Sequence, residues 1–371
     1  MKRLSLLLLS LFTVVVSIAQ IPKGSKPVMY VEFGGKGIKF GVIAYTDKSY
    51  RKYVPIENRE LNVGLAKSIE STSKISDADI KSATSSTFDT YQQLLDKYKG
   101  QLDDNDVYFY TSSGVGVAKN VQDLCTSVKT KTGHTVYVVS ETEEAKYTIA
   151  GTIPFDKVDV ALVLDQGGSN TKGGYVVKDG NMLTAVPTNF DLGSVRVAEV
   201  CTRYMRTQPE DADEYKNEFI YAMNNVFDSL RRVIKNSFSN IDGTESRNEL
   251  YLSGGAAFAI TTLLYPDADI ITQMIPVSYD KLKAFLVDIQ DRSYFRELKE
   301  KTFTDELKQK NYKNAGNIYN QIQLISATKL LLTYINALGG DEKKIYFNRF
   351  GLHSMPTMLI GRVLRGEVRR W

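Results

Sequence analysis

The stretch that decides the fold is VLDQGGSNTKGGY, residues 163–175. It starts with apolar residues typical of a buried strand, passes through a glycine pair, and returns to an apolar pattern after Lys172. This pattern predicts two antiparallel strands joined by a tight turn. Such a turn exposes backbone N–H groups, and glycine lets an anion approach them closely. The stretch therefore predicts a phosphate-binding hairpin.

The same pattern occurs earlier, in VEFGGKGIKFGVI, residues 31–43. Glu32 takes the place of Asp165 before the glycine pair, and Lys39 takes the place of Lys172. The spacing of 133 residues between Glu32 and Asp165 is too long for a solenoid repeat. We interpret the repeat as duplicated lobes, with the chain divided into a signal segment 1–19, an N-terminal lobe 20–155 and a C-terminal lobe with helical additions 156–371.

Strand and helix patterns alternate along the chain, which predicts an α/β fold. A third glycine turn, SGGAA at 253–257, follows an apolar strand and opens a helix, so Gly254 and Gly255 are candidates to hold a phosphate at a helix N-terminus. The remaining expected strands are 107–111, 136–139, 158–164 and 250–252, and the expected helices are 62–99, 118–132, 142–150, 208–240 and 280–338.

Residue counts limit the chemistry. With 2 Cys and 2 His among 371 residues, a disulfide scaffold, a histidine-based metal site and a Ser-His-Asp triad are excluded as working hypotheses. The reaction must use carboxylates, Lys, Arg, backbone amides or a bound cation. We expect Cys125 and Cys201 to be unpaired and partly buried.

The N-terminus predicts export. Lys2 and Arg3 precede an apolar run from Leu4 to Val16, and small residues follow at 17–19. This is typical of a cleaved secretory signal peptide, with an uncleaved anchor as the alternative, and places the protein in the periplasm or outside the cell. No other membrane span is expected. Without Lys2 and Arg3 the chain has 45 basic and 43 acidic residues, so charge favours neither nucleic acid nor membrane as a partner.

Carboxylates at the ends of the two strands suggest a cation. Glu32 and Asp165 would hold a hydrated Mg²⁺ beside bound phosphate, because Mg²⁺ prefers oxygen ligands and retains water. The acidic run 141–144 has two interpretations: a helix N-terminus capped by Ser140, or a general base that orients water. The phosphate-contacting candidates are Gly34, Gly35, Lys36, Gly167, Gly168, Ser169, Asn170, Gly254 and Gly255.

With these motifs in order, the chain resembles the exopolyphosphatase / guanosine-pentaphosphate phosphohydrolase family of the actin/Hsp70/sugar-kinase superfamily. The resemblance covers about residues 28–360. Residues 139–146 (VSETEEAK) resemble the family's I-S-G-x-E-E-A-R motif, and 164–172 resemble its second phosphate turn, D-I-G-G-G-S-T-E. Further similar segments are 32–39, 110–120, 191–196, 253–256 and 348–352.

The resemblance implies two ribonuclease-H-like lobes that face a cleft, and removal of a terminal phosphate from polyphosphate or a nucleotide polyphosphate with Mg²⁺. It implies that Glu143 activates the water, that Asp165 acts at the metal and that the glycine turns hold phosphate oxygens. It also suggests a homodimer.

Three departures from the family pattern affect the site. Glu32 replaces the usual Asp, and the family's Arg is missing from a stretch that here contains residues 114–116, GVG. Lys172 replaces the Glu that closes the second turn. Loss of an electrophilic Arg can slow phosphoryl transfer by several powers of ten. Lys172 would partly substitute as a phosphate clamp, with help from Lys36, Lys39 or Arg196.

The sequence therefore favours an exported hydrolase of phosphoanhydride bonds, with Glu143, Asp165 and Lys172 in catalytic roles and polyphosphate or another phosphorylated small molecule as substrate. The alternative is a catalytically degenerate protein of the same fold that binds phosphate or a polyanion. A third hypothesis is a kinase or ATPase that binds a nucleotide near Gly254 and Gly255.

Overall fold

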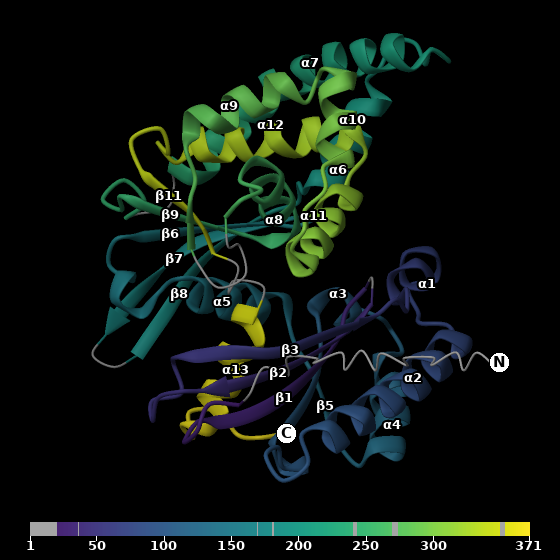
Figure 1. Ribbon diagram of the computed structural model, residues 1–371, viewed down its shortest axis with the longest axis vertical. Helices are drawn as coiled ribbons and strands as arrows, with labels where there is room; N and C mark the ends of the chain where they lie inside the picture. Colours follow the sequence, from purple (N-terminus) through teal and green to yellow (C-terminus); the bar gives the residue numbers. More distant parts are fainter. Residues whose placement is uncertain are drawn as a thin grey trace, which may run out of the picture. The chain divides into compact units, whose positions relative to one another are not determined.

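The computed structural model describes residues 21–35, 37–168, 170–179, 182–239, 243–268, 274–348 and 353–371 (Figure 1). The predicted signal segment 1–19, Lys36 and Ser169 lie outside the described residues. Backbone contacts divide the chain into two compact units. The first contains residues up to Tyr110 together with Lys119–Val136, and the second contains Thr111–Ala118 together with Tyr137–Trp371.

The first unit contains most of a five-stranded sheet. Its order is β3-β2-β1-β4-β5, and β1–β2 and β2–β3 are antiparallel pairs. The predicted first hairpin is confirmed as β1 and β2, because Glu32 pairs with Lys39 across it. The strands are β1 Lys26–Phe33, β2 Ile38–Tyr45, β3 Tyr53–Leu61, β4 Val107–Thr111 and β5 Val136–Val138.

The second unit repeats this topology in a six-stranded sheet of order β10-β11-β9-β6-β7-β8. Strands β6, β7 and β8 take the places of β1, β2 and β3, while β9 and β11 take those of β4 and β5. The pairs β6–β9 and β9–β11 are parallel, and β6–β7–β8 is antiparallel. The strands are β6 Ala161–Gln166, β7 Thr171–Asp179, β8 Met182–Phe190, β9 Glu249–Ser253, β10 Met274–Pro276 and β11 Lys344–Asn348.

Alternating residues of β6 pack into different cores, as expected for a strand covered on both faces. Leu162 and Leu164 belong to the larger core, formed with the helices between Ser194 and Ala337. Ala161 and Val163 belong to the smaller core, formed with helix α5, Glu141–Thr152. Helix α5 also contacts β7, β8 and helix α13, Ser354–Leu364, which explains why it belongs to the second compact unit. The sequence division at 155/156 assigned it to the first lobe, and the lobe boundary itself stays a prediction.

The helices agree with most of the predicted ranges. They are α1 Leu65–Thr72, α2 Asp77–Lys97, α3 Ser113–Gly116, α4 Val121–Thr132, α5 Glu141–Thr152, α6 Ser194–Arg203, α7 Ala212–Ser239, α8 Gly254–Leu264, α9 Tyr279–Asp288, α10 Arg292–Glu300, α11 Glu306–Ile318, α12 Gln321–Ala337 and α13 Ser354–Leu364. The strand expected from Val158 begins only at Ala161, because a 3-10 turn at Phe155–Lys157 precedes it. Strands β3, β8, β10 and β11 were not predicted.

Candidate active site

The second hairpin brings Asp165 and a glycine turn to the end of β6. The Gly167 N–H donates to the Asn170 carbonyl at 2.9 Å, which closes the turn. The Ser253 hydroxyl donates to Asp165 Oδ2 at 2.9 Å from the end of the neighbouring strand β9. Asp165 is half-buried, so its carboxylate combines a fixed orientation with access to solvent.

Helix α6 uses the carbonyls of this turn. The Ser194 N–H donates to Gly167 O at 3.0 Å, and the N–H groups of Val195 and Arg196 donate to Gly168 O at 2.9 and 3.2 Å. The helix N-terminus is therefore satisfied by the turn and not by an external anion. In a trans peptide the N–H points opposite to the preceding C=O, so the Gly168 N–H points away from α6. A backbone N–H that is not directed into the neighbouring helix is a potential donor to an anion.

Two glycines permit this close packing. A Cβ on Gly193 would lie 2.4 Å from the carbonyl carbon and oxygen of Gly168. Gly254 has φ +87°, and a Cβ there would lie 2.6 Å from the Gln166 carbonyl oxygen. Gly255 has open space where its Cβ would be. Gly254 and Gly255, at the start of α8, were both predicted to bind phosphate. Gly254 is required by its packing against Gln166, whereas Gly255 faces free volume.

Helix α5 holds its two neighbouring glutamates in different ways. Glu143 is the N3 residue of a capping box whose N-cap is Ser140. The Ser140 N–H and hydroxyl donate to Glu143 Oε2 at 3.1 and 2.7 Å. The Tyr137 hydroxyl donates to its Oε1 at 2.6 Å. Burial raises the pKa of Glu143, but the hydrogen bonds from Tyr137 and Ser140 outweigh it, so the pKa lies below its usual range. The structural interpretation of the acidic run is thus confirmed for Glu143, and its role as base stays a prediction.

Glu144 points to the second hairpin. Lys172 Nζ donates to its Oε1 at 2.5 Å, and the Ser113 N–H donates to its Oε2 at 2.7 Å. Both members of the ion pair are largely buried, with side chains 11% (Lys172) and 18% (Glu144) exposed. Burial raises the pKa of Glu144, yet the charge and hydrogen bond of Lys172, with the hydrogen bond from Ser113, hold it below its usual range. Sequence reasoning did not single out Glu144 or Ser113.

The stretch without the family's Arg forms the short helix α3. A Cβ on Gly116 would lie 3.1 Å from Val139 O and 3.2 Å from Val138 Cγ1, so a larger residue is accommodated there only if neighbours shift. The Cβ position of Gly114 meets nothing closer than Ser112 Oγ at 4.0 Å. The backbone of this stretch also contributes the Ser113 N–H that holds Glu144.

The first hairpin repeats the turn in the first unit. The Gly34 N–H donates to Gly37 O at 2.9 Å. Glu32 accepts from the Tyr110 hydroxyl at 2.9 Å and from Lys39 Nζ at 3.1 Å. Gly35 is half-buried beside this turn. Glu32 and Asp165 belong to different compact units.

Few side chains of the described residues are arranged to bind a cation. Among the described residues there is no group of three or more His, Cys, Asp or Glu side chains able to bind a metal. Mg²⁺ needs only one or two carboxylates when water and substrate phosphate complete its shell. Asp165, oriented by Ser253 next to the glycine turn, fits that requirement. When bound, Mg²⁺ would neutralise phosphate charge.

Two further features of the described residues bear on the sequence predictions. Cys125 and Cys201 are both free, as expected, and both are buried where partial burial was expected. Burial raises the pKa of Cys125 and brings that of Cys201 to about 12. None of the described helices combines the length and the apolar composition needed to cross a bilayer.

Comparison with solved structures places the fold. A crystal structure of a Ppx/GppA family member from Aquifex aeolicus superimposes with a TM-score of 0.67 at 16% identity, covering 93% of this chain and 99% of the other. An exopolyphosphatase from Cytophaga hutchinsonii gives a TM-score of 0.62 at 15% identity, covering 92% and 98%. At such identities the likeness shows the fold alone, and it confirms the predicted α/β class. No curated protein matches the sequence.

The sequence itself matches a family model. The Ppx/GppA phosphatase family is matched over residues 42–249, which contain α5, the second hairpin and the start of β9. More than half of the chain lies in this match. The chain therefore belongs to the Ppx/GppA phosphatase family.

Proposed function

We propose that this protein hydrolyses the terminal phosphoanhydride bond of polyphosphate or of a nucleotide polyphosphate. The observation that supports it best is the arrangement of Glu144, Asp165 and the glycine turn on adjoining elements of one unit. In the proposed site the turn would donate an N–H to a phosphate oxygen, and Asp165 would hold Mg²⁺. Family membership is consistent with this chemistry.

Glu144 is a better candidate for the general base than Glu143. Both carboxylates are hydrogen-bonded: Glu143 bonds to Tyr137 and to its own helix cap, whereas Glu144 bonds to Lys172 on the second hairpin and to the Ser113 N–H. Glu144 is preferred for its position, because it contacts the hairpin that contains Asp165. Lys172 orients this carboxylate and, when it leaves Glu144, is free to contact phosphate.

The ion pair supports a second candidate function. A base held by a buried ammonium accepts protons weakly, and the family's Arg is absent from α3. A protein with these features would bind phosphate or a polyanion without hydrolysis. The two candidates differ in one measurable respect, phosphate release.

The test is phosphate release from long-chain polyphosphate, with and without Mg²⁺, by the chain from Gln20 onward. Wild type is compared with Glu144→Gln, Glu143→Gln and Lys172→Glu. We expect Mg²⁺-dependent release that falls by about two or more powers of ten in Glu144→Gln and by less than tenfold in Glu143→Gln. Equal losses in both variants would reject the choice of Glu144. No release by wild type, with activity gained in Lys172→Glu, would identify Lys172 as the residue that turns a hydrolase into a binder.

Export is part of the proposal and rests on the charged and apolar pattern of residues 2–19. A protein purified from its native source should begin near Gln20, as measured by intact mass. A mass that includes residues 1–19 would contradict cleavage. The homodimer suggested by the resemblance is tested by the molar mass in sedimentation equilibrium.

A further inference from the structure

Trp371 packs against the strand that precedes α5. Its ring stacks on that of Tyr137 in β5, with the ring centroids 4.7 Å apart and the ring planes at 28°. Both residues belong to the second compact unit, and both are half-buried. The Tyr137 hydroxyl donates to Glu143 Oε1 at 2.6 Å. The indole therefore limits the positions of the Tyr137 ring, and with them the direction from which Glu143 receives this hydrogen bond.

The segment that follows α13 contains a tight turn held by a glutamate. Gly366 has φ +73°, a backbone conformation that favours glycine. The Glu367 N–H donates to Arg362 O at 2.9 Å, and the Glu367 carboxylate accepts from Arg362 Nε at 3.1 Å and from Arg365 Nε at 2.5 Å. Trp371 follows four residues later. The position of Trp371 therefore depends on a turn with bonds of its own as well as on the stack.

The same part of the chain contacts α5 at two further places. The Arg362 guanidinium lies 5.7 Å from the centroid of the Tyr147 ring. Tyr147 is four residues beyond Glu143, on the same side of the helix. Helix α13 packs so closely on the later part of α5 that a Cβ on Gly151 would lie 2.4 Å from Ser354 O. The side of α5 that contains Glu143 is therefore held along its length.

The first turn of α5 also carries the proposed base. Glu144 follows Glu143 and bonds to Lys172 at 2.5 Å and to the Ser113 N–H at 2.7 Å. The backbone of this turn is closed by Ser140, whose hydroxyl accepts the Glu143 N–H at 3.2 Å and whose carbonyl accepts the Glu144 N–H at 2.9 Å. Opening of the turn would therefore displace Glu144 from the second hairpin.

We propose that Trp371 is a positioning residue for Glu144. By stacking on Tyr137 it maintains the hydrogen bond to Glu143, and this bond keeps the first turn of α5 closed with Glu144 directed at the second hairpin. The inference rests on the proposed function, since it takes Glu144 as the general base. Because Trp371 acts through the geometry of the turn, its loss should lower kcat and leave KM nearly unchanged.

The kinetic test uses phosphate release from long-chain polyphosphate with Mg²⁺. We expect Trp371→Ala to lower kcat about tenfold with KM within about twofold of wild type, and Trp371→Phe to recover most of the loss because a phenyl ring still stacks. Tyr137→Phe keeps the ring and removes the hydroxyl, so it should lower kcat by a similar factor. Adding Trp371→Ala to Tyr137→Phe should then lower kcat by less than about twofold more, since the hydroxyl is already lost.

A second measurement reports the turn without hydrolysis. Hydrogen–deuterium exchange of the peptide that contains residues 140–146 should be about tenfold faster in Trp371→Ala than in wild type, with exchange in the later part of α5 unchanged. Trp371 is the only tryptophan of the chain, so an unchanged emission maximum in Tyr137→Phe verifies that the stack persists there.

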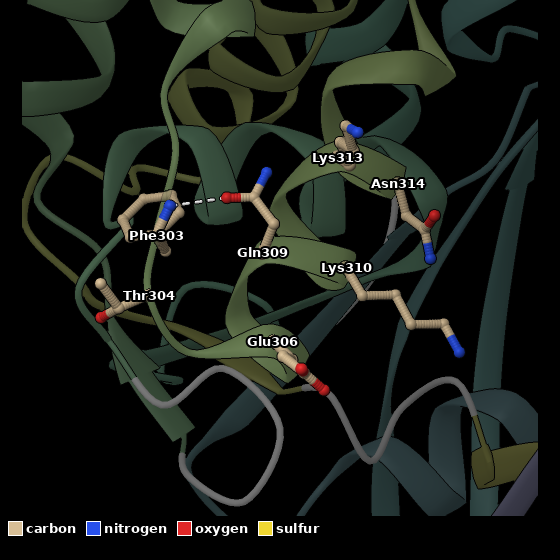
Figure 2. Close-up of a pocket in the computed structure, with 7 residues that line it drawn as sticks. All are labelled: Phe303, Thr304, Glu306, Gln309, Lys310, Lys313 and Asn314. Carbon is tan, nitrogen blue, oxygen red and sulfur yellow. Dashed lines mark hydrogen bonds between the residues drawn. The ribbon is translucent and has the colours of Figure 1, made fainter. Parts of the chain in front are cut away.

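Two control variants remove an aromatic side chain elsewhere in the second unit. Tyr346 stacks on Tyr251 with centroids 5.4 Å apart, and the Tyr251 hydroxyl donates to Glu249 at 2.8 Å, so Tyr346→Ala disturbs the same kind of arrangement away from the first turn of α5. Phe303 lines a cavity beside α11, where its N–H donates to Gln309 Oε1 at 2.6 Å (Figure 2). Tyr346→Ala and Phe303→Ala should leave kcat and the exchange of residues 140–146 within about twofold of wild type.

The outcomes separate this proposal from the proposed function. Equal losses of kcat in Trp371→Ala and Tyr346→Ala, or additive losses from Trp371→Ala and Tyr137→Phe, would overturn the role of Trp371. If Trp371→Ala speeds exchange in residues 140–146 while wild type releases no phosphate, the hold of Trp371 on the turn stands and the hydrolase does not. If wild type releases phosphate and Trp371→Ala keeps its kcat and its exchange, the hydrolase stands and the role of Trp371 is rejected.

Discussion

The two hairpins share a backbone and differ in what their lysines do. In each, a glycine N–H donates 2.9 Å to the carbonyl three positions on, and the strand pairing sets an acid opposite a lysine. Lys39 is 52% exposed and bonds to its cross-strand partner Glu32 at 3.1 Å. Lys172 is 11% exposed and bonds to Glu144 on α5 at 2.5 Å. The two hairpins therefore share a backbone arrangement, while Lys172 is buried and bonds to a glutamate of α5.

The comparison has an energetic consequence. A buried ion pair loses hydration on both partners, so removing one partner leaves an uncompensated charge. An exposed pair gains little because water screens it. The second hairpin should therefore depend on its lysine for stability, and the first should not.

The largest expected effect comes from Lys172→Met, which keeps the volume and removes the charge. Glu144 would remain buried with only the Ser113 N–H as an identified partner. We expect the free energy of unfolding to fall by about 3–5 kcal/mol, measured by urea denaturation. Lys39→Met is the matched variant and should cost at most about 1 kcal/mol. Similar losses in both hairpins would show that burial does not distinguish them.

The next effect concerns the packing of the turns. Gly193→Ala places a Cβ 2.4 Å from backbone atoms of Gly168, which have no flexible end that could yield. We expect a loss of about 1–3 kcal/mol in unfolding free energy. Gly34→Ala in the first hairpin meets Gly37 O at 3.0 Å and Glu32 Oε1 at 3.3 Å, a milder conflict. Gly34→Ala being the more destabilising of the two would contradict the picture of a second turn enclosed by α6.

A smaller effect is expected from Ser194→Ala, which removes the hydroxyl between Gly167 O and Tyr319. The lost hydrogen bonds should cost about 1–2 kcal/mol. The Ser194 N–H remains, so the turn should keep its position and its affinity for triphosphate. Calorimetry with triphosphate beside urea denaturation separates the two quantities. A large loss of affinity without loss of stability would mean that the hydroxyl contacts the ligand.

Much of the sheet topology could be predicted because the hairpins depend on local sequence patterns. An apolar strand, a glycine pair and a second apolar strand specify a hairpin, and the recurrence of that pattern at Glu32 and Asp165 predicted the duplicated topology. Strand β3 was missed because YVPIENREL contains a proline and several charges, which a pattern of alternation does not favour.

The site was predicted less completely because side-chain direction on a helix depends on contacts far along the chain. Glu143 and Glu144 are adjacent in sequence, yet one closes the helix cap and the other reaches β7. The signal for this was present, since Ser140 followed three residues later by Glu143 is a capping-box pattern. Ser253 and Ser113 gave no such signal, because their contacts with Asp165 and Glu144 join elements that only the folded sheet brings together.

The smallest expected effect is a change in the pH dependence of stability. The pKa of Glu144 is lower in the folded protein than its usual value, so the unfolded chain binds more protons in acid. The stability that Glu144 contributes is therefore complete above about pH 4.3, the usual value for Glu, and is lost as pH falls through the folded pKa. Wild type should lose unfolding free energy in this window, and Glu144→Gln should show a shallower slope.

The first hairpin supplies the control for this measurement, because Glu32→Gln removes a carboxylate paired with an exposed lysine. Urea denaturation of the three proteins from pH 6 to pH 3 gives the slopes, and each difference from wild type isolates one carboxylate. If Glu144→Gln keeps the wild-type slope, the buried pair does not stabilise the ionised form. The lysine of the second hairpin would then be held by packing, and its departure towards a phosphate would meet little electrostatic resistance.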